Sequence, residues 1–176
     1  MLTIEAGIVL EIPSPVSKKI MYLKKKYDPF QEKMPVEITV FGSSGVGVIK
    51  PGQKKSFVFS KIENALADTK AFTTSFSKIE NFPNTCVYYL KPQNRTPYDN
   101  IHTKLVSTKI LRESSPFPYN PHCSISVLEK LSEKQREEIS KENFPFEEFR
   151  INTVSVFEFQ LNPFICKKIY SFNLGS

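Results

Sequence analysis

Apolar and polar positions alternate along the chain with two different periods, one typical of strands and one typical of helices. A half-buried strand has a period of two, whereas an amphipathic helix repeats its apolar face every three or four residues. In the first half these patterns predict a strand at residues 4–12, a helix that begins at Ser14-Pro15 and carries Val16, Ile20, Leu23 and Tyr27, a strand at 36–41, a helix at 54–68 and a strand at 71–79. The first half therefore has the order β-α-β-α-β.

The second half repeats this order, with one additional strand at its end. The patterns predict a strand at 86–91, a helix beginning at Thr96-Pro97, a strand from His122, a helix at 133–141 after the capping pair Ser132 and Gln135, and strands at 150–161 and 164–174. The repeated unit predicts an α+β fold in a single domain at 1–176, with two pseudo-symmetric lobes at about 1–80 and 85–174. We expect antiparallel sheets around a central groove, with the helices outside.

The strand that begins at His122 combines a polar face with an apolar one. Because side chains alternate along a strand, one face is predicted to carry His122, Ser124 and Ser126, and the other Cys123, Ile125 and Val127. An imidazole and two hydroxyls on one face are candidates for binding a ligand or for acid–base chemistry.

A similar strand occurs 85 residues earlier (122 − 37), also just after a proline. It places Glu37 and Thr39 on one face and Val36, Ile38 and Val40 on the other. A pseudo-twofold axis between the lobes would bring the two polar faces together across the groove. Because unpaired buried polar groups are costly, such faces indicate a ligand or ordered water between them.

Composition narrows the class of protein. An apolar content of 40% and an aromatic content of 12% are typical of a globular chain. Three scattered cysteines and two histidines provide no pattern for a structural zinc site, and we expect no metal. The apolar run from Ala6 to Leu10 is too short to be a secretory or membrane-spanning segment. We therefore expect a cytoplasmic protein with reduced cysteines and no membrane partner, and we expect it to be a monomer.

The net charge of +6 and the pI near 9.1 favour polyanionic partners, but only weakly. Five lysines are predicted on the polar face of the first helix: Lys18, Lys19, Lys24, Lys25 and Lys26. Two interpretations of this face are open: a solvated surface or a surface that steers an anionic ligand.

The two polar strands resemble the motifs of a known family. A proline followed by His-x-Thr/Ser and an apolar residue, present twice in a small two-lobed α+β chain, is the pattern of the two-histidine (2H) phosphoesterases. These include the bacterial 2′-5′ RNA ligase-like proteins and the cyclic nucleotide phosphodiesterases. The second motif, His122-Cys123-Ser124-Ile125, fits this pattern well. The first, Glu37-Ile38-Thr39-Val40, has a glutamate in place of the histidine.

The resemblance implies a role for each motif residue. His122 would be the surviving catalytic acid or base, while Thr39 and Ser124 would hold the phosphate through their hydroxyls. A carboxylate at Glu37 would repel a phosphodiester by roughly 4 kcal/mol at 4 Å and an effective dielectric constant near 20. Losing an acid–base partner typically costs about 10²–10⁴ in rate. The implied protein is therefore a weakened phosphoesterase acting on RNA ends, cyclic nucleotides or 2′-5′ linkages.

Several alternatives stay open at this level. Glu37 is a candidate for a general base or for an ion pair with His122. Tyr119 precedes the second motif and could either stack on a base or pack under the loop. We predict no catalytic role for His102, which has no hydroxyl two residues later. The whole chain could also be a catalytically inactive nucleotide- or RNA-binding module, or an interaction module with no phosphate ligand.

Overall fold

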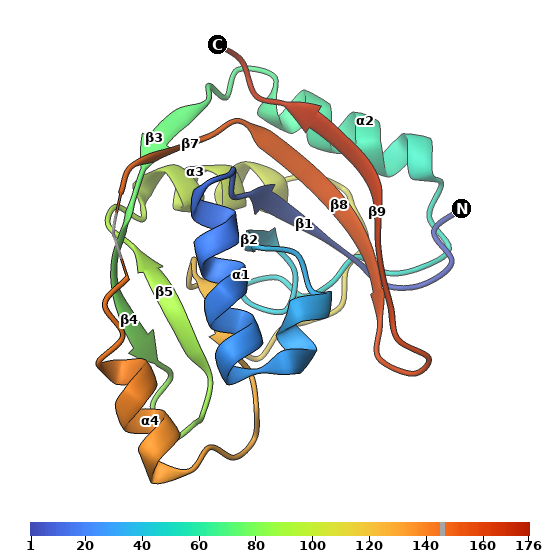
Figure 1. Ribbon diagram of the computed structural model, residues 1–176. Helices are drawn as coiled ribbons and strands as arrows, with labels where there is room; N and C mark the ends of the chain where they lie inside the picture. Colours follow the sequence, from blue (N-terminus) through green and yellow to red (C-terminus); the bar gives the residue numbers. More distant parts are fainter. Residues whose placement is uncertain (145–146) are drawn as a thin grey trace.

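The computed structural model describes residues 1–144 and 147–176. Its helices are α1 (Val16–Tyr27), α2 (Lys55–Leu66), α3 (Thr96–Val106) and α4 (Glu133–Ser140), with a 3₁₀ helix η1 (Pro29–Lys33) after α1. Its strands are β1 (Ala6–Glu11), β2 (Glu37–Phe41), β3 (Phe72–Thr74), β4 (Phe76–Asn81), β5 (Tyr88–Pro92), β6 (Cys123–Ser126), β7 (Phe149–Ile151), β8 (Thr153–Gln160) and β9 (Ile165–Asn173). The element order follows the predicted one closely (Figure 1).

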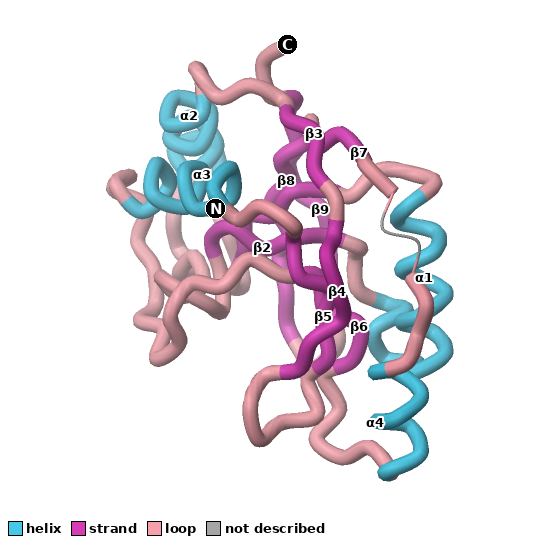
Figure 2. The backbone as a smooth tube through the Cα atoms, turned by 90° about the vertical axis from the view of Figure 1, so that its left-hand side faces the viewer, coloured by secondary structure: helices cyan, strands magenta, loops and turns pink. Residues whose placement is uncertain are grey.

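The strands pair only with antiparallel neighbours in the named sheets. One sheet has the order β2-β1-β8-β9, a second has the order β4-β5-β6, and β3 pairs with β7. Helices α2 and α3 lie on one side of the strands, and α1 and α4 on the other (Figure 2). The predicted α+β class, with helices outside antiparallel sheets, is confirmed.

Strands from both halves of the sequence contribute to each of the two larger sheets. In the four-stranded sheet β1 pairs with β8, which joins the first half to the second, and β4 pairs with β5 across the predicted midpoint of the chain. The predicted lobes at 1–80 and 85–174 therefore do not correspond to separate sheets, because β1 takes partners from both ends of the chain. A pseudo-twofold relation between two lobes stays a prediction.

Helix α1 buries its predicted apolar stripe, but one residue assigned to the polar face is buried with it. Val16, Ile20, Leu23 and Tyr27 are all buried, as predicted. Lys24 is also buried, with only 2% of its surface exposed. Lys24 follows Ile20 by four residues and precedes Tyr27 by three, so helical geometry places it beside the stripe. Its assignment to the polar face opposite the buried stripe was wrong.

The polar and apolar faces predicted for the His122 strand hold only as far as Ile125. Ser126 is fully buried, whereas 42% of Val127 is exposed. The strand ends at Ser126, and an irregularity in the β5–β6 pairing places Ser126 opposite Tyr88. Val127 instead donates its backbone N–H to Asp28 Oδ2 over 2.9 Å, which directs the chain out of the sheet. The assignment of Ser126 to the wet face and of Val127 to the apolar face was therefore wrong.

Of the four α-helices in the described residues, only α4 has a side-chain cap at its start. Ser132 accepts the backbone N–H of Gln135, and the Gln135 side chain accepts that of Ser132, which forms the predicted capping box. Before α1 the N-cap residue is Pro15, and before α3 it is Arg95; neither makes a side-chain cap. At α1 the backbone carbonyl of Pro13 accepts the N–H of Ser17, so no side chain caps this helix.

The predicted strand at 71–79 is divided into β3 and β4, because its two parts have different partners. β3 pairs with β7, whereas β4 pairs with β5. Ser75 lies between them and accepts the backbone N–H of Gln93. Within the described residues, no helix is long and apolar enough to cross a membrane.

Candidate functional site

The strands that carry the two predicted motifs lie next to each other although they belong to different sheets. Cα atoms of β2 and β6 come within 8 Å of each other. Helix α1 also packs against β6. Residues from distant parts of the sequence therefore meet around the start of β2.

Glu37 and Thr39 point to the same face of β2 and are bonded to each other. The Thr39 hydroxyl donates to the Glu37 carboxyl oxygens over 3.1 and 3.2 Å. Burial raises the pKa of Glu37 from its ordinary value of 4.5 to about 7. The charge of Lys24 and the hydrogen bond from Thr39 both oppose this rise. The carboxyl therefore titrates close to neutrality, in the range normally occupied by histidine.

Lys24 is a component of this site that the sequence analysis did not assign. Its ammonium donates to the carbonyl oxygen of Pro35 over 2.7 Å, two residues before Glu37. Its positive charge lowers the pKa of Glu37 and also that of the Cys123 thiol, so it lies close to both. The signal that could have found it is its helical spacing from Ile20 and Tyr27. A buried ammonium beside the first motif is suited to an anionic ligand.

His122 is held by one hydrogen bond and two aromatic rings. Its Nδ1–H donates to the carbonyl of Asn120 over 2.6 Å. The rings of Phe82 and Tyr89 meet the imidazole edge-on, each with its centroid 5.2 Å away. Burial lowers the pKa of His122 below its ordinary value, and the bond to Asn120 opposes this shift. The imidazole is therefore held neutral, with the lone pair on Nε2.

Ser124 and Cys123 point to opposite faces of β6. Ser124 is half-buried and paired with Tyr89, and its hydroxyl has no hydrogen-bond partner among the described residues. The Cys123 thiol is buried against the backbone of Glu37, and burial raises its pKa to about 12. Cys123 is thus the side chain of β6 that touches the first motif.

The structure joins residues within each motif but records no direct bond between the two motifs. Within the described part of the chain, no hydrogen bond links His122 or Ser124 to Glu37 or Thr39. The ion pair between Glu37 and His122 that the sequence left open is also not formed between these described residues. A ligand shared by the two motifs stays a prediction.

Tyr119 connects the approach to the second motif with the backbone of the first. Its hydroxyl donates to the carbonyl of Thr39 over 3.4 Å. Its ring stacks on His102, with centroids 3.8 Å apart and planes 4° from parallel. His102 Nδ1–H in turn donates to the carbonyl of Val40 over 2.8 Å. One face of the Tyr119 ring is therefore occupied by His102, and base stacking by Tyr119 stays a prediction.

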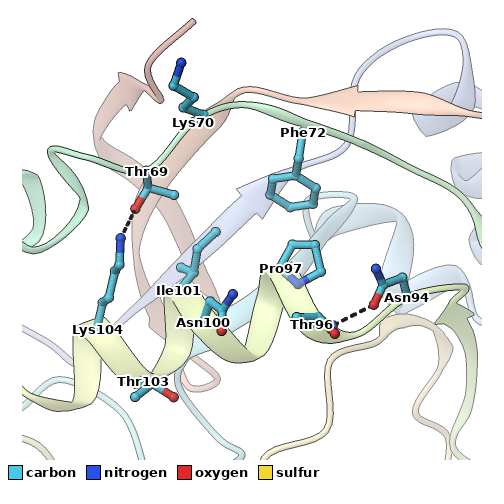
Figure 3. A pocket seen from close by; sticks show the side chains of 10 residues that line it. All are labelled: Thr69, Lys70, Phe72, Asn94, Thr96, Pro97, Asn100, Ile101, Thr103 and Lys104. Atoms are coloured by element: carbon cyan, nitrogen blue, oxygen red, sulfur yellow. Dashed lines mark hydrogen bonds between the residues drawn. The ribbon is translucent and has the colours of Figure 1, made fainter.

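One cavity of the structure lies away from the motifs. It measures about 490 Å³ and lies between α3 and the chain that enters β3. Figure 3 shows Phe72 directed toward Pro97, while Lys104 reaches Thr69 and the backbone N–H of Thr96 bonds to Asn94. Lys104 is already paired with Asp68 over 2.7 Å. None of the predicted site residues lines this cavity.

The second cavity measures about 450 Å³ and lies beside the first motif, between α1 and the four-stranded sheet. Pro35 and Val36, which directly precede Glu37, form part of its wall. This cavity adjoins the candidate site.

The fold and the two polar strands define a 2H phosphoesterase-like protein. The chain matches the sequence profile of the 2′-5′ RNA ligase superfamily over residues 13–162. The chain therefore belongs to the 2′-5′ RNA ligase superfamily. A comparison with curated protein sequences found no match.

Solved structures of three proteins have a similar fold. The apo form of LigT from E. coli superposes with a TM-score of 0.66 at 13% identity, covering 98% of each chain. The protein TT0787 of Thermus thermophilus gives a TM-score of 0.65 at 12% identity, covering 98% of this chain and 99% of the other. Usb1 of Kluyveromyces marxianus gives 0.54 at 10% identity, covering 99% of each chain. At these identities the likeness establishes the shared fold.

Proposed function

We propose that the protein is a phosphoesterase acting on RNA ends, with a 2′,3′-cyclic phosphate or a 2′-5′ linkage as its target. The observation that carries this proposal is the adjacency of β2 and β6, which bear Glu37-x-Thr39 and His122-x-Ser124. Membership of the 2′-5′ RNA ligase superfamily supports it. Structures of LigT complexed with 3′-AMP and with ATP support a nucleotide as the ligand class.

His122 is the proposed general base. Its Nδ1–H is fixed on the carbonyl of Asn120, which leaves Nε2 to accept a proton. Because burial lowers its pKa, the imidazole is neutral at neutral pH and ready to take a proton from the attacking water. The new bond then forms between the water oxygen and phosphorus.

Glu37 is the proposed general acid. With a pKa raised to about 7, a substantial fraction of its carboxyl groups are protonated at neutral pH. A protonated carboxyl donates its proton to the leaving ribose oxygen as the phosphorus–oxygen bond breaks, and it does not repel the phosphodiester. The repulsion expected for a carboxylate at this position is therefore relieved. After the reaction His122 is an imidazolium and Glu37 is a carboxylate. Proton exchange with solvent then restores the neutral imidazole and the protonated carboxyl.

The remaining side chains are proposed to hold the phosphoryl group. The Ser124 hydroxyl is free to donate, and the Thr39 hydroxyl can turn from the Glu37 carboxyl to a phosphoryl oxygen. Lys24 supplies the nearby positive charge. This chemistry requires only proton transfer and hydrogen bonding, and we propose that it needs no metal or cofactor. We further propose that the protein acts as a cytoplasmic monomer.

The proposal is tested by assaying wild-type protein and His122→Ala against 2′,3′-cyclic nucleotides and 2′-5′-linked dinucleotides. We expect turnover by the wild type and its loss in the variant, by about 10²–10⁴ if only acid–base catalysis is removed. Full turnover in the variant would remove His122 from the mechanism. Binding of a nucleoside 3′-phosphate without any turnover by the wild type would instead identify an inactive binding module.

A further inference from the structure

The cavity beside the first motif is bounded by two elements of different character. Helix α1 contributes Ser17, Lys18 and Met21, and the sheet contributes Phe157 of β8 and Lys168 of β9. Its volume of about 450 Å³ lies within the range of roughly 300–1,000 Å³ that is usual for small-molecule sites.

Strand register places this cavity on the same face of the sheet as Glu37 and Thr39. Glu11, which lines the cavity, is paired directly with Glu37 across β1 and β2, so their side chains share a face. Val9 is paired with both Thr39 and Ser155, which extends the same face to β8. Because side chains alternate, Phe157 lies on the face of Ser155.

Lys168 completes this face from the edge strand β9. It is paired with Phe157 in the register of β8 and β9. Its ammonium lies 5.8 Å from the centre of the Phe157 ring. It also forms an ion pair with Glu11 over 2.5 Å. The cavity lining and the first motif therefore lie on the same face of the four-stranded sheet.

The lining combines an excess of positive charge with apolar area. The Lys18 ammonium has no hydrogen bond or ion pair within the described residues, and the Lys168 ammonium retains two further N–H donors beyond its bond to Glu11. One carboxylate therefore faces two ammonium groups. Phe157 and Met21 add an aromatic ring and a polarisable side chain, which suit a nucleobase. The lysine ammonium groups suit a phosphate and the Phe157 ring suits a base, so this lining fits a nucleotide better than a free sugar or a peptide.

We propose that this cavity binds the second nucleotide of an RNA end, next along the strand from the nucleotide that carries the scissile phosphate. Its base packs against Phe157 and Met21, and its phosphate lies between Lys18 and Lys168. This inference rests on the proposed function, because it takes the face of Glu37 as the place of reaction. It makes the substrate an oligonucleotide end in preference to a cyclic mononucleotide.

The test compares the affinity of adenosine 3′-monophosphate with that of the dinucleotide ApA bearing a 3′-phosphate, by titration calorimetry at one salt concentration. Neither ligand is hydrolysed by the proposed reaction. We expect the wild type to bind the dinucleotide about tenfold more tightly than the mononucleotide, because the dinucleotide makes one additional base contact. The variant Lys168→Ala should lose this preference while its affinity for the mononucleotide stays unchanged.

Lys167→Ala is the matched control, because Lys167 precedes Lys168 on β9 and pairs with Glu158 on the opposite face. This variant removes one positive charge, as Lys168→Ala does, and should retain the tenfold preference for the dinucleotide. Phe157→Leu should lose part of the preference without changing its salt dependence, which separates the base contact from the charge. Thermal unfolding checks that each variant is folded.

Equal wild-type affinity for the two ligands would overturn the inference and leave the proposed function standing. Equal losses in Lys167→Ala and Lys168→Ala would also overturn it, because they would indicate a general charge effect. Failure of the wild type to bind either ligand would overturn the proposed function and this inference with it.

Discussion

The raised pKa of Glu37 makes a prediction about stability that needs no substrate. Replacing Glu37 with Gln keeps an acceptor for the Thr39 hydroxyl and removes the ionisable group. The Glu37 carboxyl has a pKa of about 7 in the folded protein, against 4.5 in its ordinary state. The folded protein therefore binds the proton more tightly than the unfolded chain does.

The sign and size of the effect follow from linkage. Between the two pKa values the folded state carries more protons, so the free energy of unfolding falls as the pH rises. The stability present below pH 4.5 is lost progressively up to about pH 7. A difference of about 2.5 pKa units corresponds to roughly 3 kcal/mol. Over this pH range the free energy of unfolding of the wild type should thus fall by roughly 3 kcal/mol relative to that of Glu37→Gln.

Urea denaturation of both proteins at several pH values from about 4.5 to about 8 measures this difference. Comparing the two proteins cancels the titration of all other groups. We expect the variant to gain stability over wild type as the pH rises, and to reach a plateau above about pH 7. A stability difference that does not change with pH would show that Glu37 ionises normally and would refute its role as a neutral acid.

Three further changes probe the same region. Lys24→Met should raise the pKa of Glu37 further, which a carbon-13 NMR titration of the carboxyl would detect as a shift of its midpoint to higher pH; an unchanged midpoint would place Lys24 outside the site. Glu37→His should raise turnover of a 2′,3′-cyclic nucleotide, and no gain would indicate a groove with another use. Gly45→Ala should lower the free energy of unfolding, measured by urea denaturation, by about 1–3 kcal/mol more than Gly52→Ala does. Both glycines have φ near +84°, so the backbone strain is the same in the two variants. Only at Gly45 would the added Cβ meet the His102 ring, at 2.6 Å. Equal losses in the two glycine variants would show that the stack of His102 on Tyr119 tolerates the added group.

Local pattern was sufficient to predict most of the elements, because strands and helices impose their periods on neighbouring residues. The capping box of α4 and the buried stripe of α1 are confirmed for this reason. Lys24 was misassigned because residue type outweighed its helical position. Ser126 and Val127 were misassigned because the end of β6 depends on a bond to Asp28, 99 residues away in the chain.

The chemistry of the site depended on contacts that no local pattern contains. The pKa of Glu37 is raised by burial that exists only in the folded chain, where α1 and β2 both contact β6. From the sequence alone, the Glu37 carboxylate was therefore expected to be charged and to repel a phosphodiester. Likewise, the pairing of β1 with strands from both ends of the chain decides how the sheets divide, and a repeated order of elements does not specify it.

A crystal structure with a bound nucleoside 3′-monophosphate tests most directly whether the two motifs serve one phosphoryl group. We expect the phosphate between β2 and β6, in hydrogen-bond contact with Thr39 and with both His122 and Ser124. A phosphate that contacts one motif while the side chains of the other point elsewhere would contradict this account.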